Sequence, residues 1–136
     1  MQRFLSICIA LWAGSLCTIC GIVAPTLFAT LDRPAAGVAV AALFRIEAWL
    51  GLLFALLSLA VLRSQPRVPS GARSLVVVSA TAPLVSELAL GPMMSSARAA
   101  NDMARFGMLH GLAAALFLLA CAGSLALLWK LSRRAE

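Results

Sequence analysis

The sequence has few charged residues and few acids for its length. Only 12% of its 136 residues are charged, five are acidic and one is a histidine. A soluble domain usually carries about 25% charged residues, so this chain cannot build a polar surface of ordinary size. It also lacks a phosphate-binding glycine loop, a Ser/His/Asp arrangement and the H-E-x-x-H zinc motif. We therefore expect neither an enzyme nor a nucleic-acid-binding protein, and no cofactor.

Hydrophobic residues, in contrast, make up 62% of the chain. One small domain cannot bury that much apolar surface, so a lipid bilayer is the expected partner. A helix needs about 20 apolar residues to cross a bilayer, and a backbone in lipid must satisfy its own hydrogen bonds. Four segments meet this length and are predicted to be helical spans: residues 4–31, 36–62, 75–95 and 106–130.

Polar breaks separate the predicted spans, at Asp32–Pro34, Arg63–Arg73 and Ala97–Arg105. Seven cations lie at the termini and around the central break: Arg3, Arg63, Arg67, Arg73, Lys130, Arg133 and Arg134. Three lie at the other two breaks: Arg33, Arg98 and Arg105. Because Lys and Arg near span ends resist translocation, both termini should be cytoplasmic. The predicted fold is all-α: an integral membrane four-helix bundle of antiparallel up-down spans, in one domain covering residues 1–136.

Small residues recur at helical spacing along three spans and predict where helices approach closely. In the first span they are Ala10, Gly14, Cys17, Gly21 and Ala24, and in the last span Gly107, Gly111 and Ala115. The second span has Ala36, Val40, Glu47, Gly51 and Ser58 on one face. We expect all three stripes to pack inside the bundle.

Four ionisable residues fall well inside the spans: Arg45, Glu47, Glu87 and His110. Such groups usually face the bundle interior or a water-filled cavity, and these four lie roughly 8–17 Å from the proposed outer ends. They predict a polar site in the outer half that binds an ion, a proton or a small solute. Arg45 lies about 200° around its helix from Glu47, so it either snorkels outward or pairs with Glu87. A purely structural ion pair is the alternative to a binding site.

The cysteines also lie inside the spans, which makes a disulfide framework unlikely. Cys17 and Cys20 have C-x-x-C spacing, and Cys121 should lie at a similar depth. Three thiols can hold Cu(I) or zinc, but cysteine is also a small packing residue. Copper or other soft-metal handling is therefore an alternative function.

The chain resembles the bacterial membrane family called domain of unknown function 4149, which is related to transmembrane protein 205. The resemblance rests on Gly14–Phe28, Ala36-Gly37, Leu43-Phe44, Gly91-Pro92-Met93 and Phe106-x-x-x-His110-Gly111. It implies four spans and a multi-pass protein of the bacterial inner membrane, and it supplies no catalytic or binding residues. A more distant resemblance is to copper-resistance permeases.

Two further hypotheses concern partners. If the predicted polar site acts on a solute, the protein should function alone or as a homo-oligomer. If instead the small-residue stripes dock on another membrane protein, the chain is a structural or assembly partner.

Overall fold

The computed structural model describes residues 2–65 and 68–133, and nearly all of them are helical. The elements are α1 (Gln2–Thr18), η1 (Ile19–Val23), α2 (Ala24–Thr30), α3 (Arg33–Arg63), α4 (Ala72–Val85), η2 (Ser86–Leu90), α5 (Gly91–Ala99) and α6 (Met103–Ser132). Here η1 and η2 are single π-helical turns inside otherwise continuous helices.

Within these residues, four helical stretches are long and apolar enough to cross a membrane: Arg3–Thr30, Arg33–Arg63, Ala72–Ala99 and Met103–Ser132. The four predicted spans are therefore confirmed, each a few residues longer or shifted at its ends. Large side chains such as Leu11, Leu56 and Leu118 remain exposed, as expected of helices that face lipid. The predicted positions Arg67 and Arg134 lie outside the described residues.

Aspartates begin the two helices that follow the short turns. Asp32 accepts a hydrogen bond from the Ala35 amide at 3.3 Å, and Asp102 accepts one from the Arg105 amide at 3.0 Å. Each carboxylate thus satisfies one of the amides that a helix leaves unpaired in its first turn. The residue before Asp102 is Asn101, whose positive φ of 56° lets the chain reverse between α5 and α6. These caps fix where α3 and α6 start.

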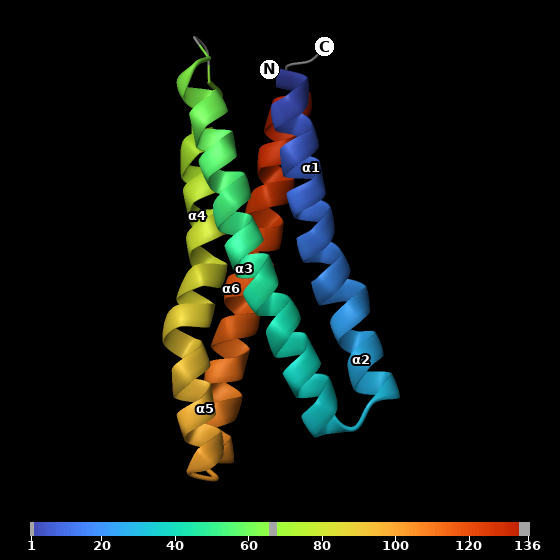
Figure 1. Cartoon of the computed structure of the whole chain (residues 1–136). Coiled ribbons are helices and arrows are strands. Elements are labelled where there is room, and N and C mark those ends of the chain that lie inside the picture. Colours follow the sequence, from blue (N-terminus) through green and yellow to red (C-terminus); the bar gives the residue numbers. More distant parts are fainter. Residues whose placement is uncertain (1, 66–67, 134–136) are drawn as a thin grey trace.

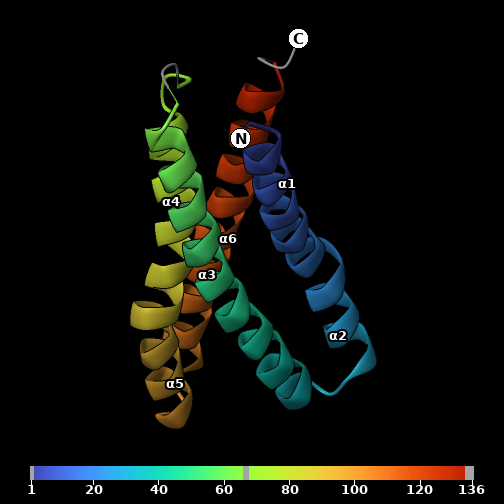
Figure 2. The ribbon, with the colours of Figure 1, turned by 45° about the horizontal axis from the view of Figure 1, so that its top comes forward.

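The helices form two hairpins that pack side by side (Figure 1). One hairpin is α1–α2 with α3, and the other is α4–α5 with α6. The start of α1, the end of α3, the start of α4 and the end of α6 lie at the same end, which we call the terminal end. There Lys130 donates to the Ser70 carbonyl at 3.2 Å. The opposite turn end holds the turns at residues 31–32 and 100–102. Figures 1 and 2 show the two hairpins diverging towards the turn end.

The core lies mainly in the half nearer the terminal end. Leu5, Ile9, Trp12 and Leu16 of α1 pack against α3, α4 and α6 residues that include Ala55, Val76 and Phe117. The predicted stripe of the second span is buried throughout, from Ala36 to Ser58.

The other two predicted stripes were placed wrongly. In the first span, Ala10, Gly14 and Gly21 are exposed, and in the last span Gly107, Gly111 and Ala115 are exposed. A Cβ added at any of these four glycines would meet no atom within 4 Å. Larger side chains, with Trp12 and Leu16 foremost on α1, contact the core instead. The stripe on α3 therefore packs inside the bundle, whereas the glycines of the other two stripes do not.

Each π-turn precedes a proline by the same distance. Residues 19–23 end two positions before Pro25, and residues 86–90 end two positions before Pro92. Ala24 donates to the Ile19 carbonyl, and Gly91 donates to the Ser86 carbonyl, which are i→i−5 bonds. Proline has no N–H and its ring crowds the carbonyl one turn earlier, so the wider turn relieves that contact. Both helices remain continuous through their prolines.

The two hairpins also repeat the same pattern of burial. At the 67-residue offset that relates Pro25 to Pro92, five buried positions of α1 match five buried positions of α4. The pairs are Leu5/Ala72, Ile9/Val76, Trp12/Ser79, Ala13/Ala80 and Leu16/Pro83. At an offset of 69, Ala48, Gly51, Ala55, Ser58 and Leu62 of α3 match Phe117, Ala120, Ser124, Leu127 and Leu131 of α6. The fold is thus two similar units, in which α1 packs on α6 as α4 packs on α3.

Candidate functional site

The four ionisable residues inside the spans do not gather in one place. Arg45 and Glu87 meet between α3 and η2, Glu47 faces α1, and His110 lies exposed on α6. The structure therefore divides the predicted polar site into three separate locations, of which the first two involve contacts between different helices.

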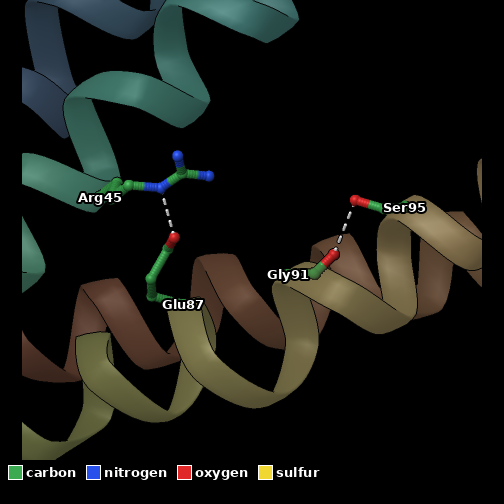
Figure 3. Close-up of polar contacts among 4 residues, drawn as sticks. All are labelled: Arg45, Glu87, Gly91 and Ser95. Carbon is green, nitrogen blue, oxygen red and sulfur yellow. Dashed lines mark hydrogen bonds and ion pairs between the residues drawn. The ribbon is translucent and has the colours of Figure 1, made fainter.

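Arg45 and Glu87 form an ion pair across the two hairpins (Figure 3). Arg45 Nε donates to Glu87 Oε1 at 2.6 Å, and the two side chains are 65% and 22% exposed. Of the two alternatives predicted for Arg45, pairing with Glu87 is the one observed. Glu87 is the second residue of η2, so the π-turn helps to aim the carboxylate at α3. It is the sole ion pair formed within residues 2–65 and 68–133.

Glu47 is buried between α3 and α1, with only 1% of its surface exposed. The Ser15 hydroxyl lies 2.9 Å from Glu47 Oε1 and also 2.9 Å from the Trp12 carbonyl oxygen. One turn towards the terminal end, the buried Trp12 indole lies against Gly51: its Nε1 would be 3.1 Å from a Cβ placed there. That indole N–H has no hydrogen-bond partner in the described part of the chain. Glu47 thus has a neutral donor, and no cation pairs with it among the described residues.

The three candidate metal-ligating cysteines meet at the α1–α6 interface. Cys17 and Cys20 are half-buried and pack against the core cluster that contains the buried Cys121, and all three thiols are free. However, no group of three His, Cys, Asp or Glu residues within 2–65 and 68–133 is arranged to hold a metal ion. The soft-metal site stays a prediction.

His110 lies near the turn end and does not contact either carboxylate. Its ring stacks on Phe106 with centroids 5.9 Å apart, and the Arg98 guanidinium lies 4.5 Å above the Phe106 ring. The terminal nitrogens of Arg98 would lie 4.0 Å from a Cβ placed on Gly37 of α3. Arg98 therefore reaches from α5 across α6 to α3 and links the two hairpins at the turn end.

Several residues of these locations were not predicted, namely Trp12, Ser15 and Arg98. In the sequence, the charge of Arg98 predicts only the orientation in the membrane, and no motif marks Trp12. One signal was available for Ser15: it lies three residues after Trp12, and residues at this spacing are neighbours on a helix surface. The π-turns had a weaker signal, since Pro25 and Pro92 are two of the three prolines inside the predicted spans.

The model of the family described as "Domain of unknown function (DUF4149)" matches residues 7–102. This chain belongs to that family. The match includes Arg45, Glu47 and Glu87, and it ends before His110 and Cys121. No curated protein and no solved structure matches the chain. The family assignment agrees with the resemblance seen in the sequence and adds no activity.

Proposed function

We propose that this protein lies in the bacterial inner membrane and handles a small solute together with protons or another small cation. In this proposal the spans are antiparallel, both termini are cytoplasmic, and the turn end faces outward. The distribution of cations in the sequence, seven at the termini and around the central break and three at the other two breaks, supports that orientation.

The buried carboxylate of Glu47 carries the proposal. Glu47 is the fifteenth residue of the 31-residue helix α3, so it lies near the middle of the membrane. An ionised carboxylate at that depth is costly unless a cation or several donors compensate it. Ser15 offers a single neutral hydroxyl, so Glu47 must take up a proton or a small cation. Groups of this kind, at this depth, mark proton and ion pathways in membrane proteins.

The interrupted helices are a second argument for solute handling. Transporters often contain two repeated halves whose helices are broken by Gly or Pro at corresponding positions, near the binding site. Here η1 with Pro25 and η2 with Pro92 occupy corresponding positions of two similar hairpins. The second residue of η2, Glu87, pairs with Arg45 on the long helix of the other hairpin, and the second residue of η1, Cys20, packs against the core. The two units could therefore shift against each other at these turns.

A deletion strain of the source organism provides the test. Its growth is compared with the parent across pH, metals, drugs and organic acids, and any defect is then complemented with variants. Glu47→Gln should fail to complement, because the amide cannot exchange a proton, and Glu47→Asp should retain part of the function. Ser58→Ala is the matched control, since Ser58 lies on the same buried face and its hydroxyl has no partner in the described region. Full complementation by Glu47→Gln would overturn the proposal.

A second candidate function is assembly with another membrane protein. It is favoured by the exposed glycines on α1 and α6, which have no neighbour within 4 Å and would allow another helix to approach closely. Purification in mild detergent separates the two candidates. A stoichiometric partner that is lost on Gly14→Leu or Gly111→Leu supports assembly, whereas an unaccompanied chain supports solute handling.

A further inference from the structure

The Arg45 guanidinium is only partly used by the protein. Its Nε donates to Glu87, but its two terminal nitrogens form no hydrogen bond or ion pair with any described residue. Figure 3 shows these nitrogens turned away from Glu87, on the side where α3 separates from the helix that carries Gly91 and Ser95. With 65% of the side chain exposed, this pair of donors is open to a ligand.

Arg45 lies at a depth where terminal guanidinium nitrogens without hydrogen-bond acceptors are energetically unfavourable. It lies 12 residues after the start of α3, which is roughly 18 Å along the helix. Arginine stays protonated in proteins, so the charge cannot be removed there. A guanidinium inside the hydrocarbon region is costly unless polar groups surround it. Glu87 neutralises the charge but leaves two N–H-bearing nitrogens without an acceptor.

A second arginine lies further along the same pair of helices. Arg98 approaches α3 at Gly37, which is two turns, or roughly 12 Å, from Arg45. The α3 residue between them on this face is the exposed Ala41. On the opposite side, Gly91 lies between Glu87 and Arg98. Each of the two helices thus carries a small residue, Ala41 or Gly91, between the positions of the two arginines.

The formal charges of Arg45, Arg98 and Glu87 do not cancel. Two arginines and one carboxylate leave a formal charge of +1, which suits a ligand with one negative charge. The free edge of a guanidinium presents two parallel N–H groups, and carboxylates and phosphates accept both. The apolar body of such a ligand would contact Ala41 and the neighbouring aliphatic side chains.

We propose that Arg45 binds the carboxylate or phosphate group of an organic anion, which Arg98 meets first at the turn end. Glu87 is a positioning residue that holds Arg45 through Nε and leaves its free edge available. This inference rests on the proposed function, because it identifies the solute of that function as an organic anion. Binding itself does not require Glu47, which faces α1 on another side of α3.

The test is equilibrium binding to the full chain in lipid nanodiscs, with benzoate and inorganic phosphate as soluble probes. One set of nanodiscs contains only phosphatidylcholine, and the other also contains phosphatidylglycerol. Benzoate should bind and raise the unfolding temperature in the neutral nanodiscs. Arg45→Gln should raise the Kd about 10- to 100-fold, as expected for the loss of a charged hydrogen-bonded contact.

Several variants keep the test decisive. Arg45→Lys retains the charge without the paired N–H groups, so it should also weaken binding, and it provides a measurement if Arg45→Gln does not fold. Arg98→Gln should slow association. Arg105→Gln, an exposed arginine at the same end, is the matched control and should change nothing. Glu47→Gln should keep benzoate binding, so a failed Glu47 complementation test and a failed binding test remain distinguishable.

The outcomes separate the sources of the anion. Stabilisation by phosphatidylglycerol that is lost in Arg45→Gln, without benzoate binding, would identify a lipid phosphate as the ligand and uphold the site. The proposal is overturned if neither probe nor lipid has an effect, or if Arg45→Gln and Arg105→Gln behave alike. It is also overturned if the only effect of Arg45→Gln is to convert a dimer into a monomer. In that case a second copy of the chain would supply the acceptors for the Arg45 guanidinium.

Discussion

Arg45 and Glu47 are two residues apart on α3, yet they contact different helices. Arg45 donates to Glu87 on η2, whereas Glu47 accepts from Ser15 on α1. A helix turns about 200° over two residues, which places the two side chains on nearly opposite faces. The anion site and the central carboxylate therefore share one rigid helix without touching. Any coupling between them must pass through a movement of α3 relative to its neighbours.

The ion pair between Arg45 and Glu87 should contribute measurably to stability. We expect a double-mutant cycle with Arg45→Met and Glu87→Leu to give a coupling energy of about 0.6 kcal/mol, up to about 1.7, the range found for polar contacts between membrane helices. Unfolding by a denaturing detergent in mixed micelles provides the free energies. The same cycle with Arg105 in place of Arg45 should give no coupling, and equal values for the two cycles would contradict the observed pairing.

Gly123 of α6 should tolerate no side chain while Ser79 is present on α4. A Cβ at Gly123 would collide with the Ser79 hydroxyl, although it would lie 3.6 Å from the Ser79 Cβ, an ordinary contact. Gly123→Ala is therefore expected to lower the free energy of unfolding by about 1–3 kcal/mol, the usual cost of overpacking. In a Ser79→Ala background, the same change should be nearly neutral.

Two controls accompany the Gly123 measurement. Ser79→Ala alone should cost little, because this buried hydroxyl has no hydrogen-bond partner in the described residues. Gly14→Ala should be neutral or stabilising, since its Cβ would meet nothing within 4 Å and alanine favours helix. Equal destabilisation by Gly123→Ala with and without Ser79 would show that the α4–α6 contact is not the cause.

The spans could be predicted from the sequence because lipid imposes one requirement on each of them: about 20 apolar residues in a helix that satisfies its own backbone. The burial of Glu47 could also be predicted, since it shares a helical face with Ala36, Gly51 and Ser58, and that entire face is buried. Both inferences required only the helical periodicity of a single span.

Contacts between helices could not be predicted in the same way. A stripe of glycines marks a face where a helix can approach, but it does not say whether the neighbour belongs to the same chain. On α1, Trp12 and Leu16 offer more contact area than Gly14 or Gly21, and they occupy the core instead. The π-turns matter as well, because they change the rotation of the residues around them relative to a regular helix. Glu47, Glu87 and His110 lie apart for this reason, because the sequence predicts how deep each residue lies in the membrane and not which helix it faces.

The thiols of Cys20 and Cys121 should form a disulfide under mild oxidation. The test uses a variant that keeps only these two cysteines and carries a protease site at Ser70, between the two hairpins. After oxidation with diamide and cleavage by the protease, the two halves should run as one band on a non-reducing gel. Diamide accepts the two electrons and two protons that the thiols lose. A variant with only Cys8 and Cys121 should separate into two fragments, because Cys8 lies about 18 Å along the helix from Cys20. Cross-linking in both variants would contradict the observed packing.

Orientation in the membrane is the last prediction, and the direction from which an anion would reach Arg98 depends on it. Both termini and the Arg63–Arg73 loop should be cytoplasmic, because the seven cations at the termini and around the central break resist translocation more strongly than the three at the other two breaks. In a cysteine-free background, Ser70→Cys should resist an impermeant maleimide in intact cells, while Asn101→Cys should react. A C-terminal fusion should fluoresce with a cytoplasm-only fluorophore and show no alkaline phosphatase activity. The reverse result in both assays would place Arg98 and Arg45 on the cytoplasmic side. The anion would then be captured from inside the cell, and the same site would serve export instead of uptake.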